Sequence, residues 1–448
     1  MNHDDPIHIG TDTRGQSVEW AFTQVSNFNA LFLGQSGGGK TWTIHQMAAR
    51  IYQRGLTLHV VDVKGDFRYE NFAASGLSDK LDPSDFNIIS FNYFDGGSSI
   101  NPLQVPRNKE GGGVLMTIES MKQLVKHFAP NTGIKQLGYL SDILREVYRK
   151  KGIDHDDEDT WGKPAPTMND VLDQVDLVAS TITSKLPIGT VEDIMDLYGR
   201  CTKKAESIIQ KSHGLDLPID TLRQEIAEVT DELIEQLKAT AIQHVNYDAL
   251  TKKTTAGSAM WEHWSRESLF GLRNTIRDMC DSRLFTGNPS RLQSGKINVY
   301  DLTEISPPHQ QIIMRIVASR VFAMGVQETK RSGRFNPRYP SHIMIADEGK
   351  HIKEISQSPM SPFNRIGTEG RGYGVGAWLG VQQPDQITQD LLRNFATFFL
   401  LKTPESAYNE VTRMFGVKPS LLKQLVPREN TLFSAGKSYD LVSHFKDS

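Results

Sequence analysis

The chain has 448 residues, enough for two or three domains, and its content of 38% hydrophobic and 23% charged residues is that of an ordinary globular protein. No apolar run is long enough to span a bilayer, the first residues are polar and acidic, and only two cysteines are present. We therefore expect a cytoplasmic protein without membrane insertion; its net charge of −3 neither indicates nor excludes a nucleic-acid partner.

The first predicted elements are a strand, a glycine-rich loop and a helix. An apolar run covers residues 28–33, and a helical face follows with Ile44, Met47, Ala48 and Ile51. The loop between them fits G-x-x-x-x-G-K-[ST] and consists of Gly34, Gln35, Ser36, Gly37, Gly38, Gly39, Lys40 and Thr41. This context favours a phosphate-binding loop over a flexible glycine turn. We expect Trp42, at the start of the helix, to contribute to the same nucleotide site.

The chemistry of such a loop assigns roles to its last two residues. Backbone N–H groups and the start of the helix attract phosphate oxygens. Lys40 is expected to reach the β- and γ-phosphates, and Thr41 to hold Mg²⁺. ATP and Mg²⁺ are therefore the predicted ligands.

Further apolar, β-branched runs read as buried parallel strands. They cover residues 57–63, 87–91, 297–302, 342–346, 375–381 and 397–401. Helical patterns separate several of them, so we predict an α/β fold with a doubly wound, mostly parallel sheet. The phosphate loop would lie at the carboxyl end of the first strand, where such sheets bind ligands.

Strand signals lapse in the middle of the chain. Helical patterns there cover residues 134–152, 219–250 and 261–280. We predict an all-α subdomain, residues 107–283, inserted between two parts of the core, residues 1–106 and 284–448. An acidic run at 154–159 is read as a solvated loop in preference to a metal site.

Two acids follow the strand predicted at 342–346. Asp347 is expected to hold Mg²⁺, and Glu348 to orient and deprotonate the water that attacks the γ-phosphate. The alternative, that both acids only cap the next helix, is disfavoured by the phosphate loop upstream.

Two residues flank the strand predicted at 375–381. Gln382 ends it and Arg371 precedes it. An amide there could sense the γ-phosphate, and a guanidinium could neutralise the charge that develops in phosphoryl transfer. From spacing alone both roles stay open against ordinary structural ones.

In order along the chain, these segments resemble the HerA/FtsK superfamily of ring-forming ATPases. The glycine loop matches the Walker A motif and residues 343–348 look like Walker B. Residues 61–67 are similar to the DPxGEY element of HerA proteins, with Asp66 replacing Glu and Phe67 replacing Tyr, and residues 100–103 resemble its NP element. The family also carries an Arg and a Gln eleven positions apart, as Arg371 and Gln382 are.

The resemblance implies a RecA-like P-loop core in which Arg371 is a finger reaching a neighbouring subunit's nucleotide and Gln382 is the γ-phosphate sensor. It further implies a homo-oligomeric, hexameric ring that moves on DNA without sequence preference. Pore-loop candidates are Arg365, Arg291 and Lys296, although the reading as ordinary surface loops is favoured for each.

The resemblance does not fix the pathway. A separate effector, such as a nuclease in antiphage defence or DNA processing, is the expected protein partner. A plasmid-transfer or viral DNA-packaging motor is a close alternative. An ATP-gated scaffold that regulates a partner enzyme is the alternative from another class.

Overall fold

The computed structural model describes residues 5–94, 96–106, 112–184, 188–212, 219–251, 264–286, 292–357, 361–436 and 438–445. They form two compact units, each with its own core. The first comprises Met1–Phe128, Ile153–Ala165 and Cys280–Ser448, and the second Ala129–Gly152 and Pro166–Met279. Of the stretch 107–283, residues 112–128, 153–165 and 280–283 thus belong to the first unit.

Seven parallel strands of the first unit correspond to the seven predicted apolar runs, which confirms the predicted α/β class. In sheet order they are β9 (Thr397–Leu400), β3 (Ala30–Leu33), β8 (Val375–Val381), β7 (His342–Ala346), β4 (Thr57–Asp62), β6 (Ile297–Asp301) and β5 (Phe86–Ser90). Strands β3, β4, β6, β7 and β8 are buried at every position. Burial on both faces explains why each reads as a continuous apolar run.

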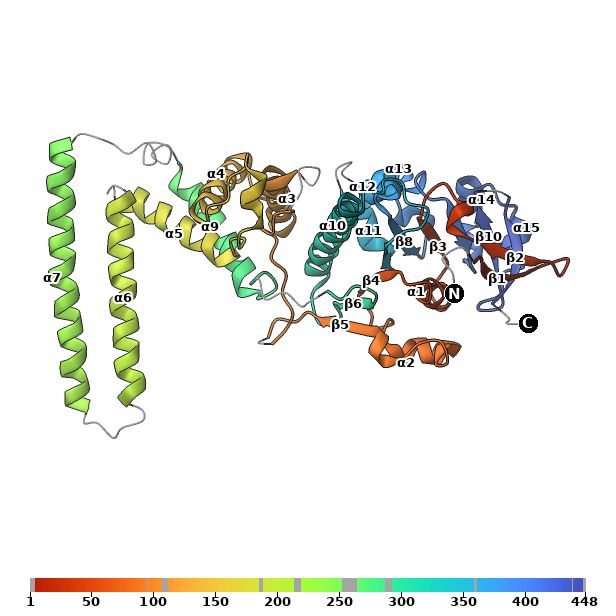
Figure 1. Ribbon diagram of the computed structural model, residues 1–448, viewed down its shortest axis with the longest axis horizontal. Coiled ribbons are helices and arrows are strands. Elements are labelled where there is room, and N and C mark those ends of the chain that lie inside the picture. The colour runs from red at the N-terminus through yellow and green to blue at the C-terminus, as the bar shows by residue number, and fades with distance from the viewer. Residues whose placement is uncertain are drawn as a thin grey trace. The chain divides into compact units, whose positions relative to one another are not determined.

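Four antiparallel strands extend this sheet beyond β9, and the sequence did not predict them. β10 (Asn430–Ala435) pairs with β9, β11 (Asp440–His444) with β10, β1 (Ile7–Asp12) with β11, and β2 (Ser17–Trp20) with β1. The first and last strands therefore lie side by side, near both labelled chain ends (Figure 1). Gly10 permits this pairing, because a Cβ there would lie 1.7 Å from the carbonyl oxygen of Ser443.

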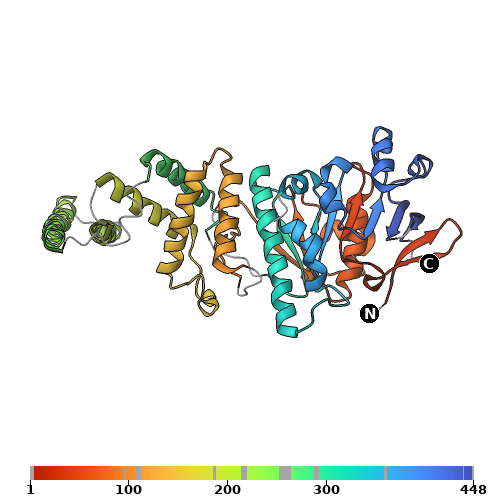
Figure 2. The ribbon, with the colours of Figure 1, turned by 90° about the horizontal axis from the view of Figure 1, so that it is seen from above.

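Helices cover both faces of the sheet. α1 (Lys40–Tyr52) packs on β3 and β4, whereas α10 (Pro307–Ser332), α11 (Gly349–Ile355) and α12 (Pro362–Glu369) pack on β7 or β8; Figure 2 shows α10 running beside the strands. Side chains of β8 alternate between the two layers. Trp378 belongs to the apolar cluster that includes α1, while Val375 lies against Gly325 of α10. The first unit's other helices are α2 (Tyr69–Phe72), α3 (Gly113–Phe128), α13 (Gln389–Leu392), α14 (Tyr408–Phe415) and α15 (Pro419–Leu422).

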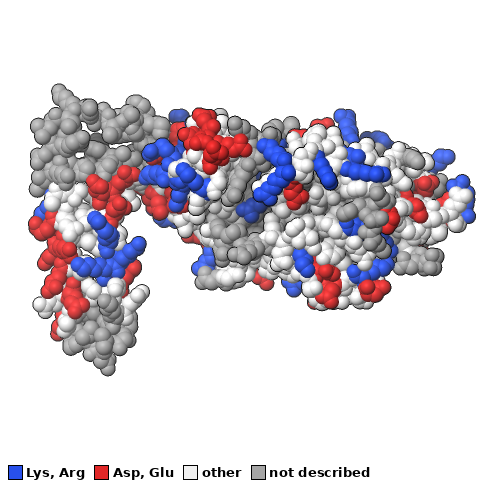
Figure 3. Space-filling model, viewed as in Figure 1, with Lys and Arg blue, Asp and Glu red and all other residues white. Residues whose placement is uncertain are grey.

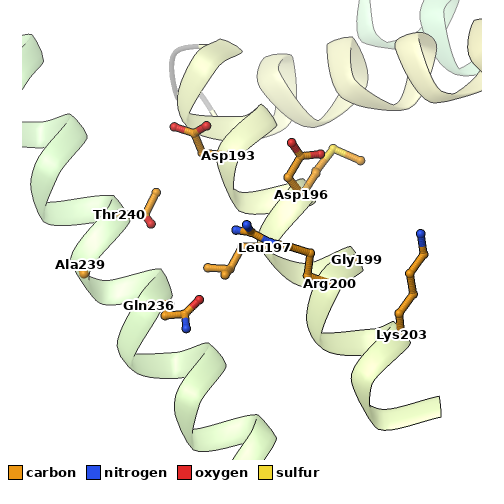
Figure 4. A pocket seen from close by; sticks show the side chains of 10 residues that line it. Asp193, Asp196, Leu197, Gly199, Arg200, Lys203, Gln236, Ala239 and Thr240 are labelled. Atoms are coloured by element: carbon orange, nitrogen blue, oxygen red, sulfur yellow. The ribbon is translucent and has the colours of Figure 1, made fainter. Parts of the chain in front are cut away.

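The described part of the second unit is helical. Its elements are α4 (Ile134–Lys150), α5 (Met168–Ser184), α6 (Ile188–Ser212), α7 (Ile219–Thr251) and α9 (Arg266–Asp281). The predicted helices at 134–152, 219–250 and 261–280 correspond to α4, α7 and α9, with residues 252–263 outside the described ranges. α6 packs along α7, and a groove between them is lined mainly by polar side chains, among them Asp193, Arg200 and Gln236 (Figure 4).

The acidic run at 154–159 is exposed and bonds to its own backbone. The backbone carbonyl of Asp154 accepts from the Trp161 indole at 2.7 Å, and Asp157 accepts from the Asp159 amide at 3.1 Å. This agrees with a solvated loop. Acidic and basic side chains are interspersed on the face drawn in Figure 3. Among the described residues, no helix has both the length and the apolar character needed to cross a membrane.

Candidate functional site

The predicted phosphate loop joins the carboxyl end of β3 to the start of α1. Its entrance is fixed by neighbouring strands, because the amide of Gly34 donates to the Val381 carbonyl at 3.1 Å and that of Gln35 to the Lys402 carbonyl at 2.9 Å. The tip of the loop, Ser36, is exposed. The sheet therefore holds the loop at its carboxyl edge, where we expected it.

The loop's conformation depends on glycine. A Cβ on Gly38 would lie 2.7 Å from the carbonyl oxygen of Lys402, and Gly39 has a φ of 91°, which side chains disfavour. Gly39 is the N-cap of α1, so the helix begins at Lys40 and its first amides have no partner within the helix. This arrangement suits an anion. Trp42 is half-buried and its ring lies 5.8 Å from that of Phe445.

Lys40, Thr41 and Asp347 meet at one point, although 306 positions separate Thr41 from Asp347. The ammonium group of Lys40 forms an ion pair with Asp347, and the Thr41 hydroxyl donates to the same carboxylate at 2.6 Å. Lys40 and Asp347 are only 7% and 6% exposed. Gly380 of β8 leaves space for the Asp347 side chain, because a Cβ at position 380 would lie 2.0 Å from the Asp347 Oδ1 atom.

These groups fit a Mg²⁺ ion. The Thr41 hydroxyl and the Asp347 carboxylate are oxygen donors already within hydrogen-bond distance of each other, and oxygen is the ligand that Mg²⁺ prefers. The glycine cradle and the start of α1 lie directly beside them. The predicted nucleotide and metal residues are therefore brought together by the fold.

Glu348, the residue after Asp347, forms an ion pair with Lys64. The Lys64 ammonium group is 2.7 Å from the Glu348 carboxylate, and Glu348 is mostly buried. Burial alone would lower the pKa of Lys64, but the hydrogen bond and charge of Glu348, with Asp347 and Asp66 adding to them, raise it above its ordinary value. In this structure the predicted catalytic acid is thus paired with a cation.

The turn that presents Lys64 is organised by Asp62, at the end of β4. The Asp62 carboxylate accepts the amides of Lys64 at 3.1 Å, Gly65 at 2.8 Å, Asp66 at 3.1 Å and Phe67 at 2.9 Å. A small recess between this turn and Asp347 is lined by Asp62, Lys64 and Asp66. Burial, and then the charges of Asp62 and Asp347, raise the pKa of Asp66. The segment resembling the HerA element therefore borders the site.

The two predicted residues that flank β8 lie at its opposite ends. Gln382 follows Val381, whose carbonyl accepts from the phosphate loop, so Gln382 is beside that loop. Arg371 precedes the amino end of β8, where its guanidinium donates to the Val25 carbonyl at 3.1 Å and lies 4.5 Å from the Phe28 ring centroid. Burial lowers the pKa of Arg371. Seven strand residues separate the two by about 20 Å.

The pore-loop candidates occupy ordinary contacts where they are described. The Arg365 guanidinium lies 4.4 Å from the Phe322 ring centroid and 3.6 Å from Glu369. Lys296 donates to the Ser84 carbonyl at 2.6 Å. Arg291 lies outside the described residues. These contacts give no support to a pore role for Arg365 or Lys296.

Sequence reasoning gave no role to three residues that shape the site. Asp62 orders the turn after β4, Gly380 admits the Asp347 side chain, and Arg428 places its backbone nitrogen 3.0 Å from the position of a Gly39 Cβ. Asp62 lies in the segment that resembles the HerA element and ends a buried strand, which was a usable signal, since parallel strands end at one edge. Arg428 carried none, because its contact depends on long-range packing.

No protein-family model matches the chain. It is similar to the DNA double-strand break repair helicase HerA of Pyrococcus furiosus, with 22% identity over 454 residues that cover 90% of this chain and 77% of HerA.

Solved structures extend the comparison to the fold. VirB4 of Thermoanaerobacter pseudethanolicus aligns with a TM-score of 0.61 at 17% identity, over 99% of this chain and 98% of VirB4. The bacterial conjugative coupling protein TrwBdeltaN70 gives a TM-score of 0.49 at 11% identity, over 98% of this chain and 89% of its own. The VirB4 likeness shows a shared fold. With the motifs in order on that fold and sequence similarity to HerA over most of both chains, this chain is similar to HerA/FtsK-type P-loop ATPases.

Proposed function

We propose that this chain is the subunit of a ring-shaped motor that uses ATP hydrolysis to translocate on DNA. The observation that carries the proposal is the division of the predicted site between the two ends of β8. Lys40, Asp347 and Gln382 lie at the carboxyl end, and Arg371 lies at the amino end. A nucleotide on this chain's loop is therefore out of reach of this chain's own Arg371.

Within one protomer, the carboxyl-end groups suffice to bind and position a nucleotide. The loop amides and Lys40 would bind the β- and γ-phosphates, and Thr41 with Asp347 would hold Mg²⁺. Mg²⁺, when bound, would offset phosphate charge. Glu348 would then orient a water molecule and accept its proton, while Gln382 would contact the γ-phosphate side of the site.

The ion pairs seen here define a resting arrangement. Lys40 is paired with Asp347, and Glu348 with Lys64. A polyphosphate attracts Lys40 more strongly than one carboxylate does, so nucleotide binding is expected to release Asp347 for the metal.

The separation along β8 leads to a ring. If Arg371 neutralises charge in the transition state, it acts on the nucleotide of a neighbouring protomer. Such a contact joins different surfaces of two identical subunits and repeats until the assembly closes. We propose a hexamer by analogy with the family that the motifs resemble.

DNA is the proposed track, because the similar HerA protein is named a DNA double-strand break repair helicase. Contacts to backbone phosphates would make binding salt-sensitive and tolerant of sequence. We further propose a cytoplasmic location and a separate protein effector, such as a nuclease in antiphage defence or DNA processing. Plasmid transfer and DNA packaging use the same motor chemistry.

The proposal is tested by measuring native mass and ATPase rate with and without duplex DNA. We expect a multi-subunit ring with nucleotide present, an ATPase rate that DNA stimulates, and displacement of a protein roadblock from the duplex. A ring whose ATPase rate is indifferent to DNA would instead support the nucleotide-gated scaffold. A lone protomer with full activity would contradict both readings.

A further inference from the structure

The loop after α10, residues 333–340, is tied to the segment that carries Arg371. The Asn336 amide donates to the Gly372 carbonyl at 2.9 Å, and the Ser341 amide donates to the Gly374 carbonyl at 2.8 Å. Asn336 itself has a φ of 53°, in the left-handed region. This loop and Arg371 therefore share one rigid piece of surface at the amino edge of the sheet.

Phe335 belongs to this loop, and one face of its ring is exposed. Its side is braced by Tyr373, at 5.5 Å between ring centroids and an angle of 77°. Gly372 lies beneath it, because a Cβ there would be 2.7 Å from the ring. Even so, Phe335 is 62% exposed. Aromatic residues are enriched at protein interfaces, and a large ring that is held from one side and exposed on the other suits such a contact.

A second exposed apolar residue lies beside the phosphate loop. Val426 is 41% exposed and begins a turn in which its carbonyl accepts the Glu429 amide at 3.2 Å and its amide donates to Asn430 at 2.8 Å. Within the same turn, Arg428 has a φ of 63° and its nitrogen lies against Gly39. Val426 is thus two residues from a direct contact with the phosphate loop.

We propose that Phe335 of one protomer packs on Val426 of a second copy of this chain. The inference rests on the proposed function and deepens it. If Arg371 reaches the neighbour's nucleotide, the surface around Arg371 faces the surface around the neighbour's phosphate loop. Phe335 lies on the first surface and Val426 on the second, so both exposed residues are brought to one interface.

This contact is heterologous, which means that it joins two different surfaces of identical subunits. It therefore predicts which pairs of residues meet at each interface. Each protomer offers Phe335 to one neighbour and Val426 to the other, so every interface contains one of each. Two copies of Phe335 never meet, nor do two copies of Val426. A two-fold dimer would give a different pattern.

Disulfide trapping tests the contact in a Cys201→Ser, Cys280→Ser background that retains ATPase activity. A chain carrying both Phe335→Cys and Val426→Cys is oxidised with a non-hydrolysable ATP analogue. We expect a ladder of covalent oligomers up to the full ring, because a disulfide forms only where Cβ atoms approach within about 4.5 Å. An equal mixture of the two single-cysteine chains should give covalent dimers and nothing larger.

Each single-cysteine chain alone should give no cross-link. Phe94, 73% exposed after β5 at the sheet's other outer edge, supplies the matched control. The pair Phe94→Cys with Val426→Cys should stay unlinked. Rings that form in native mass spectra without the Phe335–Val426 cross-link, or a dimer from Phe335→Cys alone, overturn this inference and leave the proposed function standing. Absence of rings in the parent chain overturns both.

Substitution without cysteine gives a second measurement. Phe335→Ala and Val426→Asp should each raise the protein concentration needed for half-maximal ring formation by about 10-fold, while binding of nucleotide to the protomer is unchanged. Phe94→Ala should leave that concentration unaltered. Equal assembly by Phe335→Ala and the parent chain contradicts the contact.

Discussion

The two ends of β8 differ in how many of the predicted site residues lie there and in what those residues contact. At the carboxyl end, a glycine loop, Lys40, Thr41 and Asp347 are already in mutual contact and mostly buried. At the amino end, the Arg371 guanidinium donates to the Val25 carbonyl and packs on the Phe28 ring of its own chain. Most of the predicted nucleotide and metal residues thus gather at one end, and the proposed arginine finger lies at the other.

This difference indicates that nucleotide binding and hydrolysis have separate structural requirements. In the proposed mechanism, binding needs only the carboxyl end, which one protomer supplies. Hydrolysis at full rate would need the charge of Arg371, which the same protomer holds about 20 Å away along the strand. Substitutions at the two ends should therefore have different kinetic signatures.

The largest effect is expected from Arg371→Ala. ATPase turnover should fall by about 10³-fold, because a guanidinium that stabilises the transition state contributes on that scale. Nucleotide affinity of the protomer should be unchanged, since Arg371 lies at the far end of β8. Arg393→Ala, which removes an exposed arginine paired with Asp390, is the control and should keep full activity.

Arg371→Lys sharpens this test. A lysine keeps the charge but loses the planar fork, so we expect it to recover little of the lost turnover. If Arg371→Ala instead abolishes nucleotide binding, the two ends of β8 are not functionally separate.

Glu348→Gln should reduce turnover by about 10²-fold or more, since general-base catalysis contributes on that order. ATP should remain bound, because the loop and Lys40 are intact. Glu119→Gln is the matched control, an exposed glutamate paired with Lys122 outside the site. Rapid hydrolysis by Glu348→Gln would assign the base to another residue.

Gly380→Ala probes how Asp347 reaches the loop. The new Cβ would lie 2.0 Å from the Asp347 carboxylate, so that side chain or the strand must shift. We expect Mg²⁺-dependent nucleotide affinity to fall about 10-fold and the free energy of unfolding to fall by about 1–3 kcal/mol. Gly199→Ala in α6 meets no atom within 4 Å and should be neutral or stabilising by up to about 1 kcal/mol. Equal effects from both substitutions would contradict the steric account.

Lys64→Met should have the smallest effect. Its ion pair with Glu348 is partly exposed, and such pairs contribute about 1 kcal/mol or less, which corresponds to about a 5-fold loss of turnover through poorer positioning of the carboxylate. Lys122→Met, which breaks a comparable pair elsewhere, should leave ATPase activity unchanged. A loss as large as that of Glu348→Gln would mean that Lys64 takes part in the chemistry directly.

The sequence predicted the parts of this molecule whose signals are local. Buried parallel strands appear as continuous apolar runs, and the phosphate loop has a fixed spacing. The strands β1, β2 and β11 lack the first signal, because exposed and buried positions are mixed along them. β10 is buried at its centre but carries the polar Thr431 and Ser434 there, so it does not form a continuous apolar run. The pairing of these strands also depends on residues from opposite ends of the chain, such as Gly10 and His444.

The site was predictable to a similar extent. Lys40, Thr41, Asp347 and Glu348 follow from two motifs at the carboxyl ends of β3 and β7, the two strands on either side of β8. The pairing of Lys64 with Glu348 could not be predicted from these motifs, because it depends on the turn that Asp62 organises. The parallel pairing of β3 with β8 agrees with the sequence order in placing Arg371 at the edge of the sheet opposite the loop.

The most direct test of the account is to mix two inactive proteins, Lys40→Ala and Arg371→Ala, under conditions that exchange subunits. An interface that pairs an intact loop from one with an intact arginine from the other is complete. In an equal, random mixture about a quarter of interfaces qualify, so ATPase activity should recover to about that fraction of the parent chain's rate. Mixed rings that show no recovery would contradict a site shared between protomers.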